Sequence, residues 1–209
     1  MSRRALLLAG GQPPPPDFVR ALHRPGDLVV AADSGLNLAL AAGVPTDLVV
    51  GDFDSLQPGL ERGVEIQRYP RDKDASDLEL ALEEAFRRGA REGLVLGALG
   101  GRLDHTLFNV VSLLEKALEM GFRATLLAPD QEVFAAEPGV HPISDRQGWH
   151  CSILPLDPHA RLSLEGMAYP LREEWLHRAS TRGLSNRVTS LLARVEVQEG
   201  RVLVLLARD

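Results

Sequence analysis

Residues 28–54 read LVVAADSGLNLALAAGVPTDLVVGDFD, in which two short apolar runs enclose a segment of helical pattern. The runs are Leu28 to Ala32 and Leu48 to Val50, and an aspartate follows closely after each. Apolar runs of this length, bounded by Gly, Pro or Asp, are typical of buried strands. The stretch therefore predicts two strands of a parallel sheet joined by a helix.

The same alternation extends over residues 1–128. Further strands are expected at Arg4 to Ala9, Val64 to Arg68, Leu94 to Ala98 and Ala124 to Leu127. The clearest helix covers residues 78–86; a capping box, Ser76 to Glu79, precedes it and Gly89 ends it. A second helix, ending at Gly121, is expected to carry Leu107, Val110, Val111, Leu114, Ala117 and Leu118. Residues 1–128 thus predict an α/β domain, a mostly parallel sheet flanked by helices on both faces.

Residues 129–209 show a different pattern. Ala160 to Glu165, Ala193 to Gln198 and Arg201 to Leu205 alternate apolar and polar residues, and a turn at residues 198–200 separates the last two. Alternation of period two without a long amphipathic helix predicts antiparallel strands. We expect an all-β, sandwich-like C-terminal domain.

The composition excludes several classes of partner. The chain has 23 Lys and Arg against 29 Asp and Glu, a formal net charge of −6, which argues against a nucleic-acid or anionic membrane surface. A single cysteine, Cys151, cannot form an internal disulfide, and no apolar run approaches membrane-spanning length. These features predict a cytoplasmic protein.

Seven aspartates follow the expected strands of the parallel sheet. They are Asp33, Asp52, Asp54, Asp72, Asp74, Asp77 and Asp104. Ligands of open α/β sheets bind outside the carboxyl ends of the strands, so these side chains are expected to meet in one crevice. Gathered carboxylates repel one another unless a cation neutralises them, and oxygen ligands suit Mg²⁺. The pattern indicates a magnesium site.

Basic residues and glycines accompany these acids. Arg68, Arg71 and Lys73 lie near the acids of residues 72–77, and Arg102 follows Gly100 and Gly101. A guanidinium offers a planar donor pair for phosphate, and glycines let the backbone approach a ligand closely. Gly10 and Gly11, after the first strand, have either this role or only that of a tight turn.

The absence of other motifs narrows the chemistry. The chain has neither a G-x-x-x-x-G-K-[ST] phosphate loop nor a G-x-G-x-x-G dinucleotide fingerprint. Its six histidines show no zinc-motif spacing. Metal and phosphate groups without a covalent nucleophile indicate phosphoryl-type transfer.

Several motifs together resemble the thiamine pyrophosphokinase family. The resemblance rests on Ala32 to Gly35, Gly51 to Ser55, Lys73 to Glu79, Leu99 to His105, Gly166 to Leu171 and Gly183 to Asn186. It covers nearly the whole chain, in the family's order. It implies an ATP- and Mg²⁺-binding catalytic domain over residues 1–128, a thiamine-binding domain over residues 129–209, and a homodimer whose sites combine both subunits. The implied reaction converts ATP and thiamine into thiamine diphosphate and AMP.

The resemblance also assigns roles to matching residues. Asp52, Asp54 and Asp77 are implied as metal ligands and, together with Asp104 and Arg102, as catalytic residues. ATP contacts are implied for Asp33, Lys73, Asp74, Gly100, Gly101 and Arg102, and thiamine contacts for Ser185 and Asn186. The proton acceptor is either Asp77 or Asp104.

Two positions depart from the family pattern. Ser76 stands where threonine is familiar, and Arg187 stands where bacterial relatives often have glutamate. A cation beside a thiazolium ring is repulsive, so either Arg187 points away or the pocket differs. The alternative functions are a pyrophosphokinase for another hydroxymethyl heterocycle such as a pterin, a non-catalytic nucleotide or thiamine sensor, and a nucleotide-sugar transferase.

Overall fold

The computed structural model describes residues 3–53 and 63–209, and the chain divides into two compact units, residues 1–129 and 130–209. The first unit contains β1 (Arg4–Leu8), α1 (Pro16–Leu22), β2 (Leu28–Ala32), α2 (Gly35–Ala42), β3 (Leu48–Gly51), β4 (Glu65–Arg68), α3 (Asp77–Arg87), β5 (Glu92–Leu96), α4 (Leu103–Phe108), a π-helical turn (Asn109–Leu113), α5 (Leu114–Glu119) and β6 (Arg123–Ala128). The second contains β7 (Gln131–Ala136), β8 (Gly139–Ser144), β9 (His150–Pro155), β10 (His159–Glu165), β11 (Leu171–His177), a 3₁₀ turn (Thr181–Gly183), β12 (Asn186–Arg187), β13 (Leu192–Glu199) and β14 (Val202–Ala207).

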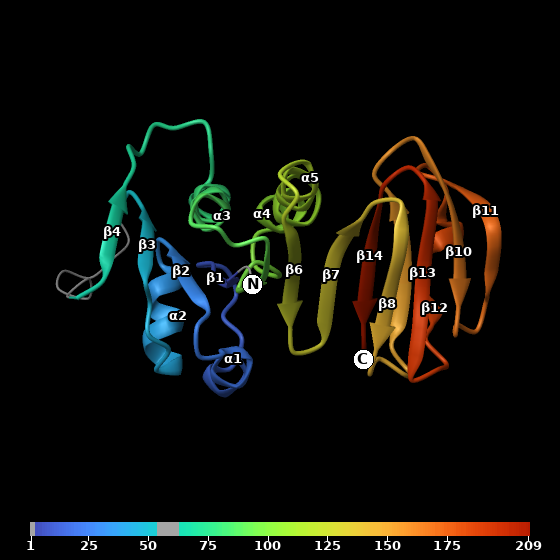
Figure 1. The fold of residues 1–209 in the computed structure, drawn as a ribbon, viewed down its shortest axis with the longest axis horizontal. Coiled ribbons are helices and arrows are strands. Elements are labelled where there is room, and N and C mark those ends of the chain that lie inside the picture. Colours follow the sequence, from blue (N-terminus) through green and yellow to red (C-terminus); the bar gives the residue numbers. More distant parts are fainter. Residues whose placement is uncertain (1–2, 54–62) are drawn as a thin grey trace. The chain divides into compact units, whose positions relative to one another are not determined.

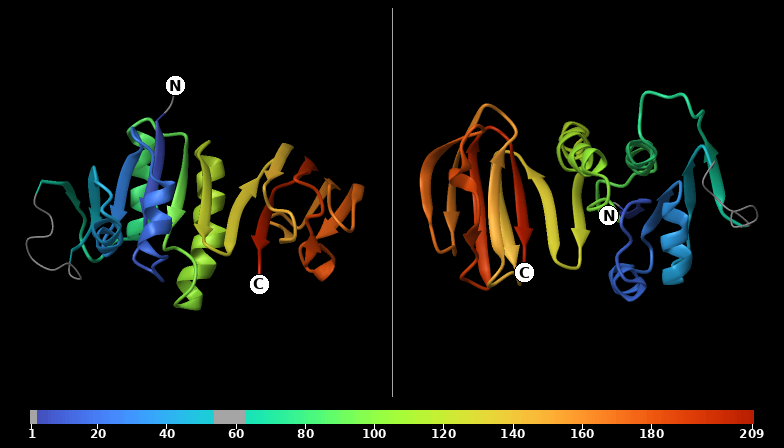
Figure 2. Two further views of the ribbon diagram at one scale, coloured as in Figure 1. Left: turned by 90° about the horizontal axis from the view of Figure 1, so that it is seen from below. Right: turned by 180° about the vertical axis from the view of Figure 1, so that it is seen from behind.

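The strands of the first unit form a parallel sheet in the order β6-β5-β1-β2-β3-β4. Starting from β1, the chain adds β2, β3 and β4 on one side and then returns to add β5 and β6 on the other; β4 lies at the edge of this sheet (Figure 2). The direction of strand addition therefore reverses between β1 and β5. Such a reversal is where open α/β sheets bind their ligands.

Helices cover both faces of this sheet, as the sequence predicts. α1 and α2 lie on one face, and α3, α4 and α5 lie on the other (Figure 1). Leu6 and Leu8 of β1 pack toward α2 in a core that includes Leu36 and Ala39. The strands β1, β2 and β3 are buried on both faces, which is why their sequences are almost continuously apolar.

The second expected helix differs from the prediction. Residues 103–119 are helical, but a π turn over Asn109–Leu113 interrupts the α-helical pattern. A π turn inserts one extra residue into the helix. Each helical residue rotates the chain by about 100° around the helix axis, so the insertion shifts the side chains that follow to another face. Leu114 and Ala117 are buried, whereas Leu107 is 52% exposed, so the expected apolar residues do not share one buried face.

The second unit consists of two antiparallel sheets, β12-β9-β14-β7 and β11-β10-β13-β8. One hydrophobic core, which includes Ile153, Leu162, Val195 and Val204, takes residues from both sheets. The two alternating segments around residues 198–200 do not pair with each other: β13 and β14 belong to different sheets. The predicted sandwich-like architecture is confirmed, and the turn carries the chain from one sheet to the other.

Cys151 lies inside this core. Its side chain is fully buried, and burial raises the pKa of the thiol to about 12. A thiol with this pKa is almost entirely protonated at neutral pH, so Cys151 behaves as a small apolar core residue. No helix in the described part of the chain is long and apolar enough to cross a membrane.

Candidate active site

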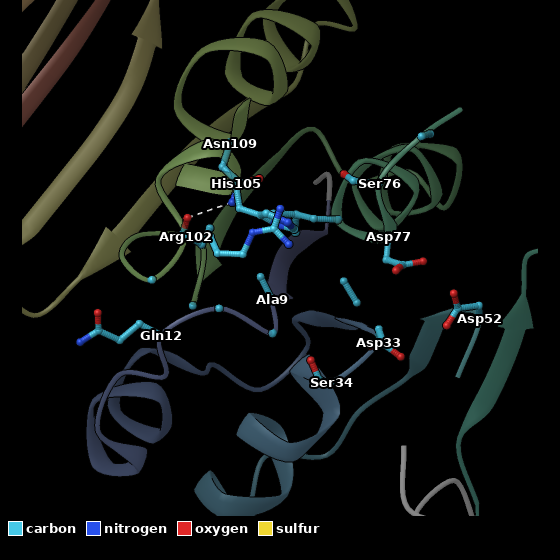
Figure 3. A pocket seen from close by; sticks show the side chains of 18 of the residues that line it. Ala9, Gln12, Asp33, Ser34, Asp52, Ser76, Asp77, Arg102, His105 and Asn109 are labelled. Atoms are coloured by element: carbon cyan, nitrogen blue, oxygen red, sulfur yellow. Dashed lines mark hydrogen bonds between the residues drawn. The ribbon is translucent and has the colours of Figure 1, made fainter. Parts of the chain in front are cut away.

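A cleft of about 720 Å³ lies at the carboxyl ends of β1, β2, β3 and β5, beside the reversal of strand addition (Figure 3). Its lining also includes the loop before α3, the start of α3, and residues of α4 and the π turn. The polar and glycine residues that line it are Gly10, Gly11, Gln12, Asp33, Ser34, Asp52, Arg71, Lys73, Ser76, Asp77, Gly97, Gly100, Gly101, Arg102, His105 and Asn109.

Three of the predicted aspartates line this cleft together. Asp33 follows β2, Asp52 follows β3, and Asp77 is the first residue of α3; all three lie on the same side in Figure 3. Asp33 has a left-handed backbone with φ of 45°, and its N–H donates to the carbonyl of Val50 at 2.8 Å. The predicted convergence of carboxylates from separate strand ends is therefore present for these three. Asp54 lies outside the described residues.

The donor set determines what kind of metal site these acids can form. Within residues 3–53 and 63–209, no three His, Cys, Asp or Glu side chains are arranged to hold a metal ion by themselves. Mg²⁺ commonly binds one or two carboxylates together with water and substrate phosphate oxygens. The carboxylates of Asp52 and Asp77 fit a magnesium ion held partly by a phosphate substrate.

Lys73 supplies a cation beside these carboxylates. Its Nζ lies 2.8 Å from Oδ1 of Asp77, and the side chain of Lys73 is only 13% exposed. Asp77 is placed by the start of α3, where Ser76 accepts a hydrogen bond from the N–H of Glu79 at 3.2 Å. This capping interaction was expected from the sequence and positions the Lys73–Asp77 pair at the cleft.

Arg102 lines the cleft and is paired with Asp104. Arg102 donates to Asp104 through Nε at 3.1 Å and Nη2 at 2.5 Å. These bonds, with a weaker contribution from the N–H of His105, lower the pKa of Asp104 to about 2. A carboxylate with this pKa is a weak proton acceptor at neutral pH. Asp104 itself is not among the lining residues of the cleft, and neither are Asp72 and Asp74.

Gly10 and Gly97 allow the loops after β1, β2 and β5 to pack tightly. A Cβ atom on Gly10 would lie 1.9 Å from Oγ of Ser34, and one on Gly97 would lie 2.5 Å from the carbonyl oxygen of Ala9. The N–H of Gly11 donates to the carbonyl of Gly97 at 3.0 Å. Gly10 and Gly11 are therefore required for close packing of these loops, and they also line the cleft; a role in letting the backbone approach a ligand stays a prediction.

Gly97→Ala is expected to lower the free energy of unfolding by ~3 kcal/mol, because it combines a left-handed φ with a backbone clash. Gly43→Ala is the control: Gly43 has a similar φ of +66°, but nothing lies near its Cβ position. Its cost is expected to be ~1 kcal/mol. Urea unfolding of both variants measures the difference, and equal losses would contradict the close approach of the two loops.

Asn109 ties the π turn to the glycine-rich loop. Its Nδ2 donates to the carbonyl of Ala98 at 2.9 Å (Figure 3), and Oγ1 of Thr106 donates to the carbonyl of Gly100 at 3.1 Å. Sequence reasoning missed Asn109 and Gln12 as residues of the cleft. The spacing of four between His105 and Asn109 was a signal for the first, because it places them on one helical face.

A second pocket, of about 430 Å³, lies in the second unit. Its lining residues are Leu164, Ala168, Tyr169, Pro170, Leu171, Glu174, Arg182, Gly183, Leu184, Ser185 and Asn186. The predicted residues Ser185 and Asn186 are thus brought together here. The sequence did not predict Glu174 and Arg182 as pocket residues, because neither belongs to a recognisable local motif.

Asn186 shapes the wall of this pocket. Its Oδ1 accepts from the N–H groups of Tyr169 at 3.0 Å and Arg187 at 2.8 Å, and its Nδ2 donates to the carbonyl of Tyr169 at 2.7 Å. Ser185 has a φ of 59°, and its N–H donates to Oγ of Ser152 at 3.0 Å. Arg187 is exposed and does not line the pocket.

Two family descriptions match the chain over most of its length. The thiamin pyrophosphokinase catalytic domain matches residues 19–124, and the thiamin pyrophosphokinase vitamin B1 binding domain matches residues 140–202. The chain belongs to the thiamine pyrophosphokinase family. The resemblance in the sequence motifs is confirmed, and each of the two pockets contains residues of one matched region.

Members of the thiamine pyrophosphokinase family resemble this chain in both sequence and structure. A thiamine pyrophosphokinase from Bacillus subtilis is 28% identical over 190 residues, covering 87% of this chain and 88% of the relative. The thiamin pyrophosphokinase structure from Geobacillus thermodenitrificans has a TM-score of 0.85 at 27% identity, covering 98% of this chain and 97% of that one. The B. subtilis structure, at 24% identity, has a TM-score of 0.87, covers 99% and 100% of the two chains, and supports the fold.

Proposed function

We propose that this chain transfers the pyrophosphoryl group of ATP to the hydroxyl group of thiamine, giving thiamine diphosphate and AMP. The observation that carries the proposal is the cleft beside the strand reversal, where Asp52 and Asp77 face Lys73 and Arg102 in a member of this family. Phosphoryl transfer requires acidic side chains that bind a metal ion and cationic side chains that bind the phosphates.

In this reaction the thiamine hydroxyl oxygen forms a bond to the β-phosphorus, and the bond from that phosphorus to the oxygen of the α-phosphate breaks, releasing AMP. Lys73 and Arg102 are proposed to hold the phosphates in line and to offset their negative charge. The backbone of Gly100 and Gly101, with Asp33, is proposed to position ATP. Asp74 stays a prediction from the sequence.

Asp52 and Asp77 are proposed to hold Mg²⁺, with Asp54 as a further predicted ligand. When bound, Mg²⁺ supplies neutralisation of phosphate charge. The proton of the hydroxyl must pass to a base. Arg102 lowers the pKa of Asp104 to about 2, which makes Asp104 a weak proton acceptor, and Asp77 is the other candidate from the sequence.

Thiamine is proposed to bind the pocket of the second unit. This pocket lies within the region that matches the vitamin B1 binding domain, and it contains Ser185 and Asn186. The exposed position of Arg187 outside the lining supports the view that its charge points away from a bound cation. A cytoplasmic location stays a prediction from the single cysteine.

The decisive experiment is product analysis with purified protein, thiamine, ATP and Mg²⁺. Formation of AMP and thiamine diphosphate in equal amounts supports the proposal. ADP formed in a thiamine-dependent reaction would instead indicate an ordinary kinase. Turnover with a hydroxymethylpterin but not with thiamine would indicate a pyrophosphokinase for another heterocycle.

A homodimer with sites shared between subunits is a further part of the proposal. An apolar surface on α4 supports it: Leu103 is 72% exposed and Phe108 is 70% exposed, next to Leu107. Apolar surface of this kind marks interfaces between proteins. Arg102 and His105, which line the cleft, border the same segment.

Phe108→Asp is expected to convert the dimer into monomers. A symmetric interface contains each residue twice, so the loss of two buried phenylalanines removes ~4 kcal/mol or more of association free energy. Light scattering after size exclusion should show half the mass at micromolar concentration. Leu40→Asp, at an exposed leucine of α2, is the matched control and should keep the wild-type mass. A wild-type monomer would contradict the prediction.

A further inference from the structure

The pocket of the second unit contains one acidic and one basic side chain among its described lining residues, Glu174 and Arg182. The rest of the lining consists of apolar, glycine and uncharged polar residues. Glu174 and Arg182 are paired with each other: Nη2 of Arg182 donates to Oε2 of Glu174. The pocket therefore holds a carboxylate that an internal cation neutralises.

An irregularity in β11 brings Glu174 to the pocket. Leu171 and Glu174 both line it, although residues three apart in a regular strand point to opposite faces. The register shifts between the pairs Leu162–Glu174 and Leu164–Leu171, so one extra residue on β11 reverses the direction of the side chains that follow. Glu173, at this bulge, has a left-handed φ of 49°, and its N–H donates to Oγ of Ser163 at 3.0 Å. The backbone of β11 is therefore locally strained at Glu173, directly before Glu174, whose side chain lines the pocket.

Arg182 belongs to the 3₁₀ turn Thr181–Gly183, whose backbone is held by a hydrogen bond and by close packing. The N–H of Arg182 donates to Oγ of Ser180 at 3.2 Å, and a Cβ on the next residue, Gly183, would lie 2.1 Å from the carbonyl oxygen of Ile153. The side chains of Arg182 and Glu174 are 58% and 38% exposed. Water screens a pair with this exposure, so the guanidinium can exchange with another cation while the turn stays in place.

We propose that Glu174 is the specificity residue for the cationic ring of the substrate, and that Arg182 is the internal cation that this ring displaces. The proposal rests on the proposed function, because thiamine carries a permanent positive charge on its thiazolium ring. A cationic ring can replace Arg182 beside the carboxylate, whereas a neutral heterocycle cannot. The pair thereby selects against uncharged rings of similar shape.

Substitutions of the two residues of this ion pair are expected to have opposite effects on thiamine binding. Glu174→Gln should raise KM for thiamine about tenfold, because the ring loses its counter-ion. Arg182→Gln should lower KM for thiamine about threefold, because the competing cation is gone. Neither variant should change KM for ATP, since the cleft of the first unit contains neither residue. A purely structural ion pair predicts changes of the same sign in both variants.

The test measures KM for thiamine in both variants, and also the affinity of each variant for a neutral analogue in which a thiophene ring replaces the thiazolium. The expected result is opposite shifts for thiamine and no shift for the neutral analogue. Glu165→Gln and Arg194→Gln break another exposed pair of the same unit, 2.6 Å apart, and should leave KM unchanged. Shifts of the same sign, no shift in either variant, or equal shifts with the neutral analogue overturn the proposal. A wild-type protein that makes no AMP from thiamine contradicts the proposed function instead.

Discussion

Asp52→Asn is expected to lower kcat by about 10³-fold, which corresponds to ~4 kcal/mol of lost transition-state stabilisation. Asp52 follows β3 and lines the cleft near Asp33 and Asp77. The amide keeps the shape of the side chain but removes the negative charge with which Asp52 is proposed to hold Mg²⁺. The fold should be unaffected, because the substituted atoms lie at the cleft and not in the core.

The measurement is initial rates of AMP formation at saturating thiamine and ATP, with magnesium varied. The variant should need more magnesium and stay slow when the metal is in excess. Asp17→Asn, on α1, removes the same charge from an exposed ion pair with Arg20 and is the control, with kcat expected to be unchanged. Wild-type turnover in the Asp52 variant would remove this carboxylate from the mechanism.

Lys73→Met is expected to reduce kcat/KM for ATP by about 10² to 10³-fold. The variant loses the cation that is proposed to bind the phosphates, and it also leaves the carboxylate of Asp77 without the contact at 2.8 Å. Lys73→Arg keeps the charge with a different geometry and should restore part of the activity. The comparison separates a need for positive charge from a need for the lysine itself.

The chain's other lysine gives a matched control. Nζ of Lys116 lies 2.5 Å from Glu79 and also contacts Glu83, so it joins α3 to α5. Lys116→Met should cost ~1 kcal/mol of stability, as expected for a partly exposed ion-pair network, and leave kcat/KM for ATP unchanged. An equal loss of activity in the two lysine variants would mean that Lys73 acts through stability and not through phosphate binding.

Local sequence signals predicted the parts of this fold that depend on local chemistry. We could predict β1, β2 and β3 from their own apolar residues, and the start of α3 from its capping box, without reference to distant residues. The carboxyl-end rule for parallel sheets correctly placed Asp33, Asp52 and Asp77 in one cleft. The resemblance to the thiamine pyrophosphokinase family rested on several motifs that occur in the family's order along the chain.

Features that no local motif marks were not predictable from the sequence. The π turn at residues 109–113 changes which face of the helix is buried, and no residue type marks such an insertion. The turn before β14 looks like any other tight turn, yet it joins two sheets. Glu174 reaches its pocket through a bulge opposite Ser163, which depends on the register between β10 and β11.

The burial of Cys151 provides an intrinsic reporter of folding. Since this thiol is the only one in the chain, has no exposed surface and has a pKa of about 12, alkylating reagents can reach it only when the sandwich opens. The rate of labelling by iodoacetamide in dilute urea should therefore follow the opening of residues 130–209 alone. Ligands that bind the first unit should leave this rate unchanged unless the two units unfold together.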